Sequence, residues 1–370
     1  MPTEAAENAP GAGVPDAAPV RPESPSGRPD DERADGPTGG GVERAAGRLG
    51  LAGFALYALA APHSIAVSWM GLSAAVAAWL LRLLATRRTG LRRTPLDLPL
   101  WLFFGWTALS CLLSYEPRVS LPKLVNVSTL LMFYLAQGLL TRRAAVLLAA
   151  LLVVSGSAGA LWGAGELVVG RGVVVSGLSV DSPLRRGTPL REGDAVWRVN
   201  GRRVDSVEEI DDAIRRTPPG ERVSLSVISH GEHVEWPGAV VNEEMRARPS
   251  PSGITGGGRT HSFRASGWTR HYETFAEVLQ LAAQLALGFA LAAWLRRESD
   301  EEKEGRRGRG EGGVQSRAFG LSPRLRVLLP ALAFVLLAMG IALTAMRTTL
   351  VAFAVGAAVV AWRATARGRQ

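Results

Sequence analysis

The sequence predicts a polytopic α-helical membrane protein, with about eight transmembrane helices and one inserted small α+β domain. Long uncharged apolar runs recur between residues 49 and 362, and a membrane-spanning helix needs roughly 20 such residues. Basic residues cluster beside these runs rather than within them. One stretch, residues 170–243, differs from the rest because its charges are dense and its apolar residues are spaced for strands.

Both ends of the chain are polar. Residues 1–47 are rich in Pro, Gly, Ala and acidic residues, with almost no large apolar side chains. Such a segment buries too little surface to offset its chain entropy, so we expect a disordered cytoplasmic tail. Residues 363–370 form a short basic tail.

The first membrane domain is expected at residues 48–169, with about five transmembrane helices. The run 49–81 contains no Asp, Glu, Lys or Arg, and Pro62-His63-Ser64 interrupts it. This break favours a helical hairpin over a single long span. A further span is expected at residues 97–114. After a short loop, 115–123, the next span ends near residue 140, and another covers residues 144–169.

The second membrane domain is expected at residues 271–362, with about three transmembrane helices. One span covers residues 274–295, and Arg347 splits the last apolar stretch, 327–362, into two short spans. Residues 296–326 are dense in Lys and Arg and are expected to form a cytoplasmic loop. The Pro/Ser/Gly-rich residues 244–270 are expected to be a linker.

The basic residues beside the spans predict the orientation. With both ends of the chain inside, every basic cluster next to a span falls on the cytoplasmic face and residues 170–243 fall outside. This arrangement explains the net charge of +9 without a nucleic-acid partner. Cys111 is the only cysteine, so the sequence predicts no intrachain disulfide and no cysteine metal site. No cofactor is expected.

The charge-dense insert predicts strands around one helix. Asn200-Gly201 is a strong signal for a two-residue hairpin turn. Ser206 and Glu209 match a capping box that opens a helix reaching about Arg216. Residues 223–227 alternate as a half-buried strand, and the turn His230-Gly231 leads into a final strand.

The insert contains a series of turn and core residues: Ser182-Pro183-Leu184, Gly187, Leu190, Gly193-Asp194, Val196 and Val199-Asn200-Gly201. On these residues it resembles a bacterial PDZ domain of the periplasmic-protease kind. PDZ domains bind extended C-terminal peptides by strand addition at a sheet edge, which here implies peptide contacts at Gly172, Val173, Val174 and Val175. The Gly-rich carboxylate loop of that family is not evident before Val173, so a docking or spacer role stays open.

A protease is not indicated. An intramembrane metalloprotease needs His-Glu-x-x-His on a helix, so that both imidazoles reach one zinc ion. The nearest match, His230-Gly231-Glu232-His233, lacks this spacing and lies at a strand turn. The sequence therefore predicts no metal site.

Six short stretches of the spans and their flanks form a recognisable set: APHSIA (61–66), WLLR (79–82), LSYEPRVSL (113–121), RASG (264–267), HYETFA (271–276) and ALG (286–288). On these residues the spans resemble the O-antigen ligase and polymerase superfamily of integral-membrane glycosyltransferases. This resemblance implies a protein of the bacterial inner (plasma) membrane that acts on polyprenyl-diphosphate-linked glycans at the periplasmic face, with no metal.

Four arginines are the candidates for binding the diphosphate: Arg118, Arg264, Arg270 and Arg347. All four are predicted on the outer face, against the positive-inside trend, and the planar guanidinium fork matches phosphate oxygens. The alternative is that Arg264 and Arg270 extend to lipid headgroups. His271 is the candidate general base for an acceptor hydroxyl, or else an interfacial histidine.

Two functions stay open at this stage. The superfamily continues with further spans and an outer loop that holds its candidate catalytic histidine, and this chain ends at Gln370 without them. We therefore leave open whether the chain is a truncated product, is completed by another chain, or is not catalytic. The second hypothesis is a membrane scaffold whose PDZ-like domain recruits a protein partner. The expected partners are a lipid-linked glycan, membrane lipids and, in the second case, that protein.

Overall fold

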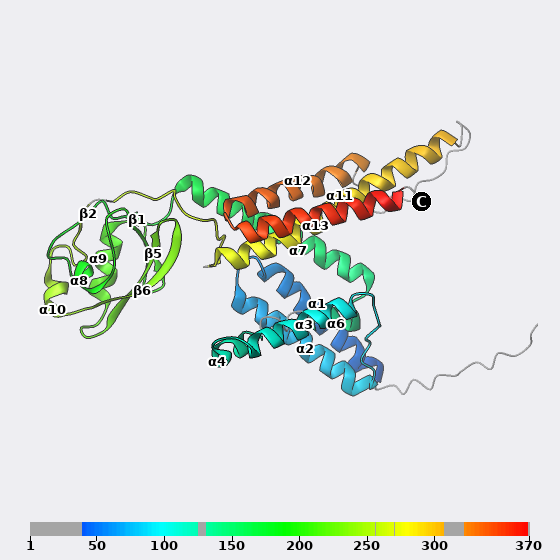
Figure 1. Ribbon diagram of the computed structural model, residues 1–370, viewed down its shortest axis with the longest axis horizontal. Helices are drawn as coiled ribbons and strands as arrows, with labels where there is room; N and C mark the ends of the chain where they lie inside the picture. Colours follow the sequence, from blue (N-terminus) through cyan, green and yellow to red (C-terminus); the bar gives the residue numbers. More distant parts are fainter. Residues whose placement is uncertain (1–38, 125–130, 256, 270, 307–321, 369–370) are drawn as a thin grey trace, which may run out of the picture.

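The computed structural model describes residues 39–124, 131–255, 257–269, 271–306 and 322–368. It contains two groups of helices and one α+β unit (Figure 1). Residues 1–38 of the predicted N-terminal tail lie outside the described residues, as do residues 307–321 of the predicted cytoplasmic loop. The predicted tail is wrong for residues 39–47, which are helical and continue directly into the first apolar run.

The first group begins with the predicted hairpin. Helix α1 (Gly39–Ala60) and helix α2 (Ile65–Thr86) are separated at the Pro62-His63-Ser64 break, which confirms the prediction of two helices. Ser64 caps α2 by accepting a hydrogen bond from the Val67 amide at 3.4 Å. A Cβ added at Gly53 would lie 2.7 Å from the Gly71 carbonyl oxygen, so the two backbones touch. Small residues allow this close approach of membrane helices.

The rest of the first group is less densely packed. Helix α3 (Asp97–Leu112) has no buried residue. The short helix α4 (Pro117–Ser120), the 3₁₀ turn η1 (Leu121–Lys123) and helix α6 (Leu131–Leu139) follow. Residues 125–130, which belong to the predicted fourth span, lie outside the described residues.

The second group is a bundle of four long helices: α7 (Arg142–Val169), α11 (Tyr272–Arg306), α12 (Pro323–Leu343) and α13 (Arg347–Gly368). Its core is formed by the fully buried side chains of Phe275 and Leu279 from α11 and of Leu337 and Ile341 from α12. Ala160 on α7 is close enough that a Cβ at Gly340 would lie 2.8 Å from its Cβ. Small residues at this contact therefore let α7 and α12 pack closely.

Among the described residues, five helices are long and apolar enough to cross a membrane: α2, α7, α11, α12 and α13. Helix α3 is apolar but shorter. Helix α1 carries Glu43, Arg44 and Arg48 in its first half, which reduces its apolar length. The architecture is that of a helical, multi-pass membrane protein, and the count of eight spans stays a prediction.

The α+β unit follows α7. Its main sheet is antiparallel, with the order β1-β3-β5-β6, and β4 pairs with β3. A second, two-stranded sheet pairs β2 with β7. The elements are β1 (Val173–Val174), β2 (Gly177–Leu178), α8 (Pro183–Gly187), β3 (Ala195–Val199), β4 (Arg202–Arg203), α9 (Val207–Arg216), β5 (Arg222–Ser229), β6 (Glu232–Val240), α10 (Glu243–Ala247) and β7 (Ile254–Thr255).

The local signals of the insert are confirmed. Asn200 and Gly201 have φ values of 48° and 76°, as a two-residue hairpin turn between β3 and β4 requires. Ser206 caps α9 by accepting a hydrogen bond from the Glu209 amide at 3.3 Å. The Glu209 carboxylate in turn accepts from the Asp205 amide at 2.8 Å, which completes a variant of the capping box.

One face of the main sheet forms the core of the unit with α9. Ile210 and Ile214 of α9 are fully buried against Val196, Val223 and Leu225 of the sheet. The other face covers a smaller cluster, in which Trp197 and Ile228 pack with Phe263 and with Leu167 of α7. The sheet is therefore packed on both faces, and its second face holds the unit against the end of α7.

The expected linker, residues 244–270, is wrong over much of its length, because residues 244–255 and 257–260 belong to the unit. Helix α10 and strand β7 lie within it, and Leu178 pairs with Ile254. Ile254 is buried in the core of the unit, which a linker residue would not be. Pro, Ser and Gly dominate this stretch, so a single buried isoleucine was too weak a signal to predict a strand.

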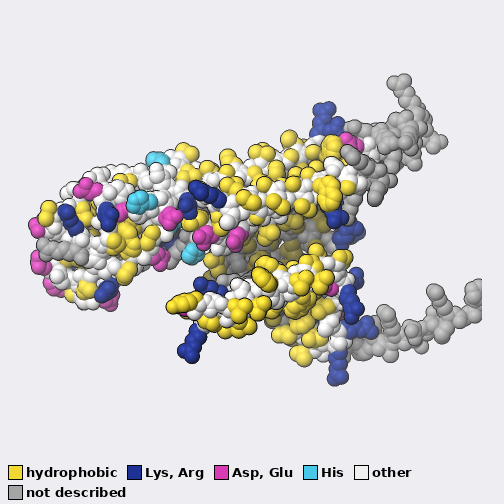
Figure 2. Space-filling view, viewed as in Figure 1, with side chains coloured by type: hydrophobic (Ala, Val, Ile, Leu, Met, Phe, Trp, Pro, Cys, Tyr) yellow, Lys and Arg dark blue, Asp and Glu magenta, His cyan; other side chains and the backbone are white. Residues whose placement is uncertain are grey.

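The two ends of the long helices differ in charge. Figure 1 places the α+β unit and α4 at one end of the helices, and the C-terminus at the other. Figure 2 shows Lys and Arg side chains gathered at the end away from the unit, and apolar side chains along the flanks. Helix ends on that side carry Arg87, Arg142, Arg143, Arg324 and Arg363.

Candidate functional site

Three of the four candidate arginines lie on elements at the end of the helices that carries the α+β unit. Arg118 is exposed on α4, Arg264 is half-buried in the segment before α11, and Arg347 is exposed as the first residue of α13. Arg270 lies outside the described residues.

Arg264 is already engaged by the protein. Its Nη2 atom lies 3.2 Å from the Glu232 carboxylate of β6, and its Nη1 atom donates to the Tyr272 hydroxyl at 2.6 Å. The guanidinium also lies over the Tyr272 ring, 4.7 Å from its centroid. Arg264 therefore ties the β5–β6 hairpin to the start of α11, and a diphosphate would have to compete with Glu232 for it.

Arg347 follows a tight turn between α12 and α13. The amide of Ala265 donates to the Leu343 carbonyl at 3.0 Å, so this turn is joined to the segment that carries Arg264. Ala345 has a φ of 53°, and Thr344 is fully buried and donates to the Ile341 carbonyl at 2.7 Å. The turn fixes Arg347 at the amino end of a 22-residue helix, where the helix dipole also favours an anion.

His271 is exposed directly before α11. Its carbonyl accepts hydrogen bonds from the Thr269 hydroxyl at 3.0 Å and from the Phe275 amide at 3.2 Å, which fixes the backbone at this position. The exposed imidazole of His271 and the guanidinium of Arg264 are therefore carried by the same segment before α11.

The four candidate peptide-binding residues, Gly172, Val173, Val174 and Val175, do not form an open sheet edge. Val174 donates its amide hydrogen to the Gly258 carbonyl at 2.7 Å, and Arg171 and Thr260 exchange two hydrogen bonds. The prediction that a peptide adds at this edge is therefore wrong for this structure, because the chain's own residues 258–260 occupy it.

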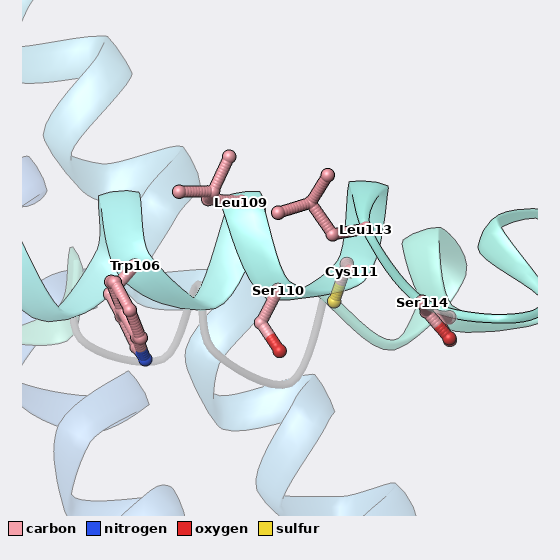
Figure 3. Close-up of a pocket in the computed structure, with 7 residues that line it drawn as sticks. Trp106, Leu109, Ser110, Cys111, Leu113 and Ser114 are labelled. Carbon is pink, nitrogen blue, oxygen red and sulfur yellow. The ribbon is translucent and has the colours of Figure 1, made fainter.

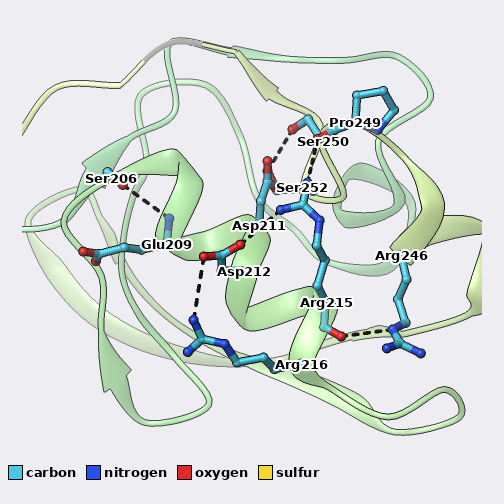
Figure 4. A network of polar contacts seen from close by, with 10 residues as sticks. All are labelled: Ser206, Glu209, Asp211, Asp212, Arg215, Arg216, Arg246, Pro249, Ser250 and Ser252. Carbon is cyan, nitrogen blue, oxygen red and sulfur yellow. Dashed lines mark hydrogen bonds and ion pairs between the residues drawn. The ribbon is translucent and has the colours of Figure 1, made fainter.

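Residues 249–255 and 257–260, which we call the edge segment, also lie along α9. Figure 4 shows Asp211 accepting from the Ser252 amide, at 2.8 Å, and Arg215 donating to the Pro249 carbonyl, at 2.8 Å. Nearer the start of α9, a Cβ at Gly257 would lie 3.3 Å from a methyl group of Val207. The edge segment therefore fills the space between the sheet edge and α9.

A buried arginine that sequence reasoning missed joins the unit to α7. Arg171 is 5% exposed and forms an ion pair with Glu166 in the last turn of α7. Its guanidinium lies 4.9 Å from the Trp197 ring centroid and 4.8 Å from that of Phe263. Burial lowers the pKa of the Arg171 guanidinium, and the charge of Glu166 opposes that shift.

The backbone on either side of Arg171 requires glycine. Gly170 and Gly172 have φ values of 81° and 65°. A Cβ at Gly172 would lie 2.8 Å from both the Val196 carbonyl oxygen and the Trp197 Cβ. In the sequence, Glu166 near the end of an otherwise apolar run, followed by Gly-Arg-Gly, was the signal for this junction.

A second cluster that sequence reasoning missed joins three segments: the turn between α1 and α2, helix α7, and the segment before α11. The Nε2 atom of His63, between α1 and α2, lies 2.9 Å from the Ser155 hydroxyl of α7, which donates to the Leu59 carbonyl at 2.7 Å. The His63 ring meets the Trp268 ring edge to face, with centroids 4.4 Å apart. Trp268 in turn stacks on Trp162 of α7 at 5.0 Å.

The hollows recorded in the described residues lie away from these clusters. One, of about 440 Å³, lies at the end of α3. Figure 3 shows Ser110 and Ser114 on the same side of α3 as Trp106, with Leu109 and Leu113 on the other. Another, of about 320 Å³, lies between α8, β6 and α10. No candidate arginine lines either one.

Within the part of the chain that the structure describes, no three His, Cys, Asp or Glu side chains are close enough to hold a metal ion. No protein-family model, no curated protein and no solved structure matches this chain.

Proposed function

We propose that this membrane protein binds polyprenyl-diphosphate-linked glycans at the membrane face that carries the α+β unit, as an O-antigen ligase-like protein of the bacterial inner membrane. In this proposal the α+β unit is a PDZ-like domain in the periplasm. The observation that carries the proposal is the position of Arg347, exposed at the amino end of α13 and joined through Leu343 and Ala265 to the segment of Arg264.

The distribution of charge supports this orientation. Arginines concentrate at the helix ends away from the unit, as the positive-inside rule expects of a cytoplasmic face. Arg118 and Arg347 are at the opposite end, so a role other than orientation has to account for them. A lipid diphosphate is an anion anchored at the headgroup level, and arginine is the side chain best matched to its oxygens.

The reaction that this proposal implies is glycosyl transfer. The oxygen of an acceptor hydroxyl attacks the anomeric carbon of the sugar, and the bond from that carbon to the diphosphate oxygen breaks. His271 takes the proton of the acceptor hydroxyl as general base. The polyprenyl diphosphate leaves as an anion, whose charge Arg347 stabilises.

Binding of the diphosphate tests the proposal. The full chain in detergent micelles, titrated with polyprenyl diphosphate, should bind it more tightly than polyprenyl monophosphate. We expect Arg347→Ala to weaken diphosphate binding at least tenfold and Arg347→Lys to weaken it less. Arg363→Ala, at the other end of α13, is the matched control. Equal affinity of the wild type and Arg347→Ala would remove the basis of the proposal.

A second candidate function, a non-catalytic scaffold that recruits a protein partner, is favoured by the junction at Arg171. The buried Arg171–Glu166 pair and the packing of Phe263 hold the unit in one orientation on α7. Since the β1 edge is occupied, a partner would use another surface, such as the hollow between α8, β6 and α10. A photo-crosslinker at Asn242 should then capture a discrete partner in cells, and one at Arg202 should not.

A further inference from the structure

We propose that the stacked pair Trp162–Trp268 is the surface against which a sugar ring of the lipid-linked glycan lies. This inference rests on the proposed function and names the part of the substrate that the arginines do not contact. The two rings come from α7 and from the segment before α11, and they stack with centroids 5.0 Å apart and an interplanar angle of 24°.

The pair is exposed in spite of its stacking. Trp162 is 41% exposed and Trp268 is 38% exposed, whereas Trp197 in the junction is 3% exposed. The face of an indole ring is electron-rich, and the C–H groups of a pyranose ring are weakly electropositive, so the two attract each other and exclude water. An exposed, rigid aromatic surface is therefore suited to a sugar ring.

Three contacts hold the Trp268 ring and its backbone in place. The His63 ring meets it edge to face at 4.4 Å, and Ser155 fixes His63 through a 2.9 Å hydrogen bond. Around Trp268, the Thr269 hydroxyl donates to the Ser266 carbonyl at 2.7 Å, which closes the turn that presents the ring. A tryptophan that only anchors a helix at the membrane interface needs no such fixed orientation.

The location of the pair agrees with a lipid-linked ligand. Trp268 is four residues after Arg264, and the intervening Ala265 is hydrogen bonded to Leu343 in the turn that leads to Arg347. The pair and the candidate diphosphate site therefore belong to one connected set of segments at the outer end of the bundle. A diphosphate at the arginines would place the attached sugar at the same end as the pair.

The experiment compares two ligands in the full chain in detergent micelles: polyprenyl diphosphate, and polyprenyl diphosphate that carries a short oligosaccharide. We expect the wild type to bind the glycosylated lipid more tightly. Trp268→Leu should lower its affinity for the glycosylated lipid at least fivefold and leave binding of polyprenyl diphosphate within twofold. Trp101→Leu, at an exposed tryptophan of α3, is the control and should change neither.

Trp162→Leu provides a second variant in case Trp268→Leu disturbs the turn, since Trp162 lies on the exposed side of α7. The inference is overturned if neither variant weakens binding of the glycosylated lipid, or if both ligands lose affinity equally in folded protein. The inference is also overturned if the wild type binds the two ligands equally tightly. In that case the binding of polyprenyl diphosphate would still support the proposed function. Failure of the wild type to bind either lipid would instead refute the proposed function itself, and this inference with it.

Discussion

The Nε2 atom of His63 lies 2.9 Å from the Oγ atom of Ser155, so the turn between α1 and α2 is hydrogen bonded to the middle of α7. The two helix groups of the membrane part therefore share a specific polar contact. Since Ser155 also donates to the Leu59 carbonyl, it satisfies an acceptor at the end of α1 that the helix itself leaves unpaired. Loss of either side chain would loosen the contact between the groups.

The His63 contact predicts a pH dependence of stability. Burial lowers the pKa of the His63 imidazole in the folded chain below its usual value of about 6.5. As the pH falls, His63 is therefore protonated at a higher pH in the unfolded chain than in the folded chain. The folded chain loses stability below about pH 6.5 as a result. Thermal unfolding in detergent between pH 7.5 and 5.5 should show a falling midpoint. His63→Gln should reduce this slope, and an unchanged slope in His63→Gln would refute the assignment.

Removing one partner of the junction ion pair should be strongly destabilising. Arg171→Met removes the buried partner of Glu166 and leaves it paired only with Arg203, at 3.0 Å. A buried charge left without any partner costs about 3–5 kcal/mol, so we expect a loss at or below the lower end of that range. Hydrogen exchange of residues 171–174 in the purified chain should become much faster. Arg216→Ala breaks an exposed pair with Asp212 and should change stability by less than about 1 kcal/mol. Similar effects of the two variants would contradict the described junction.

Gly172 should not tolerate a side chain. Gly172→Ala combines a φ of 65° with a Cβ 2.8 Å from the Val196 carbonyl oxygen, and a strained backbone of this kind costs on the order of 1–3 kcal/mol. Gly165→Ala is the control, because nothing lies within 4 Å of an added Cβ in that helical position. It should stabilise α7 slightly, by up to about 1 kcal/mol. Chemical unfolding of both variants measures the difference.

Ile254 should contribute to the core of the α+β unit. Ile254→Ala removes a side chain that is 4% exposed and should cost about 2–5 kcal/mol. The neighbouring Thr255 is exposed, so Thr255→Ala should have little effect. Protease resistance of residues 170–260 compares the two variants. Equal resistance would mean that this stretch is the linker that its composition suggests.

Much of the fold follows from local signals in the sequence. The uncharged runs predict α2, α7, α11, α12 and α13, because the period and length of a membrane helix are set by its own residues. The break at Pro62-His63-Ser64 and the turn at Asn200-Gly201 are likewise where local chemistry requires them. Elements of this kind need no knowledge of distant partners.

The remaining features depend on contacts between distant residues. The pairing of Val174 with Gly258 cannot be read from either sequence segment, because a Gly-rich stretch has no strand signal of its own. The same holds for Arg171 and His63, whose roles arise from partners on other elements. Sequence reasoning selected Arg264 for its charge, and only the structure shows that Glu232 already neutralises it.

The position of the edge segment has a consequence for how the chain matures. Strand β1 emerges from the ribosome before Gly258 and Thr260, its neighbours on the open side, have been synthesised. Until roughly eighty further residues have been synthesised, the edge of the nascent sheet has unpaired amide and carbonyl groups, which can pair with other chains. Newly made copies therefore pass through an aggregation-prone interval on the way to the finished protein, and a product interrupted before residue 258 would remain in that state.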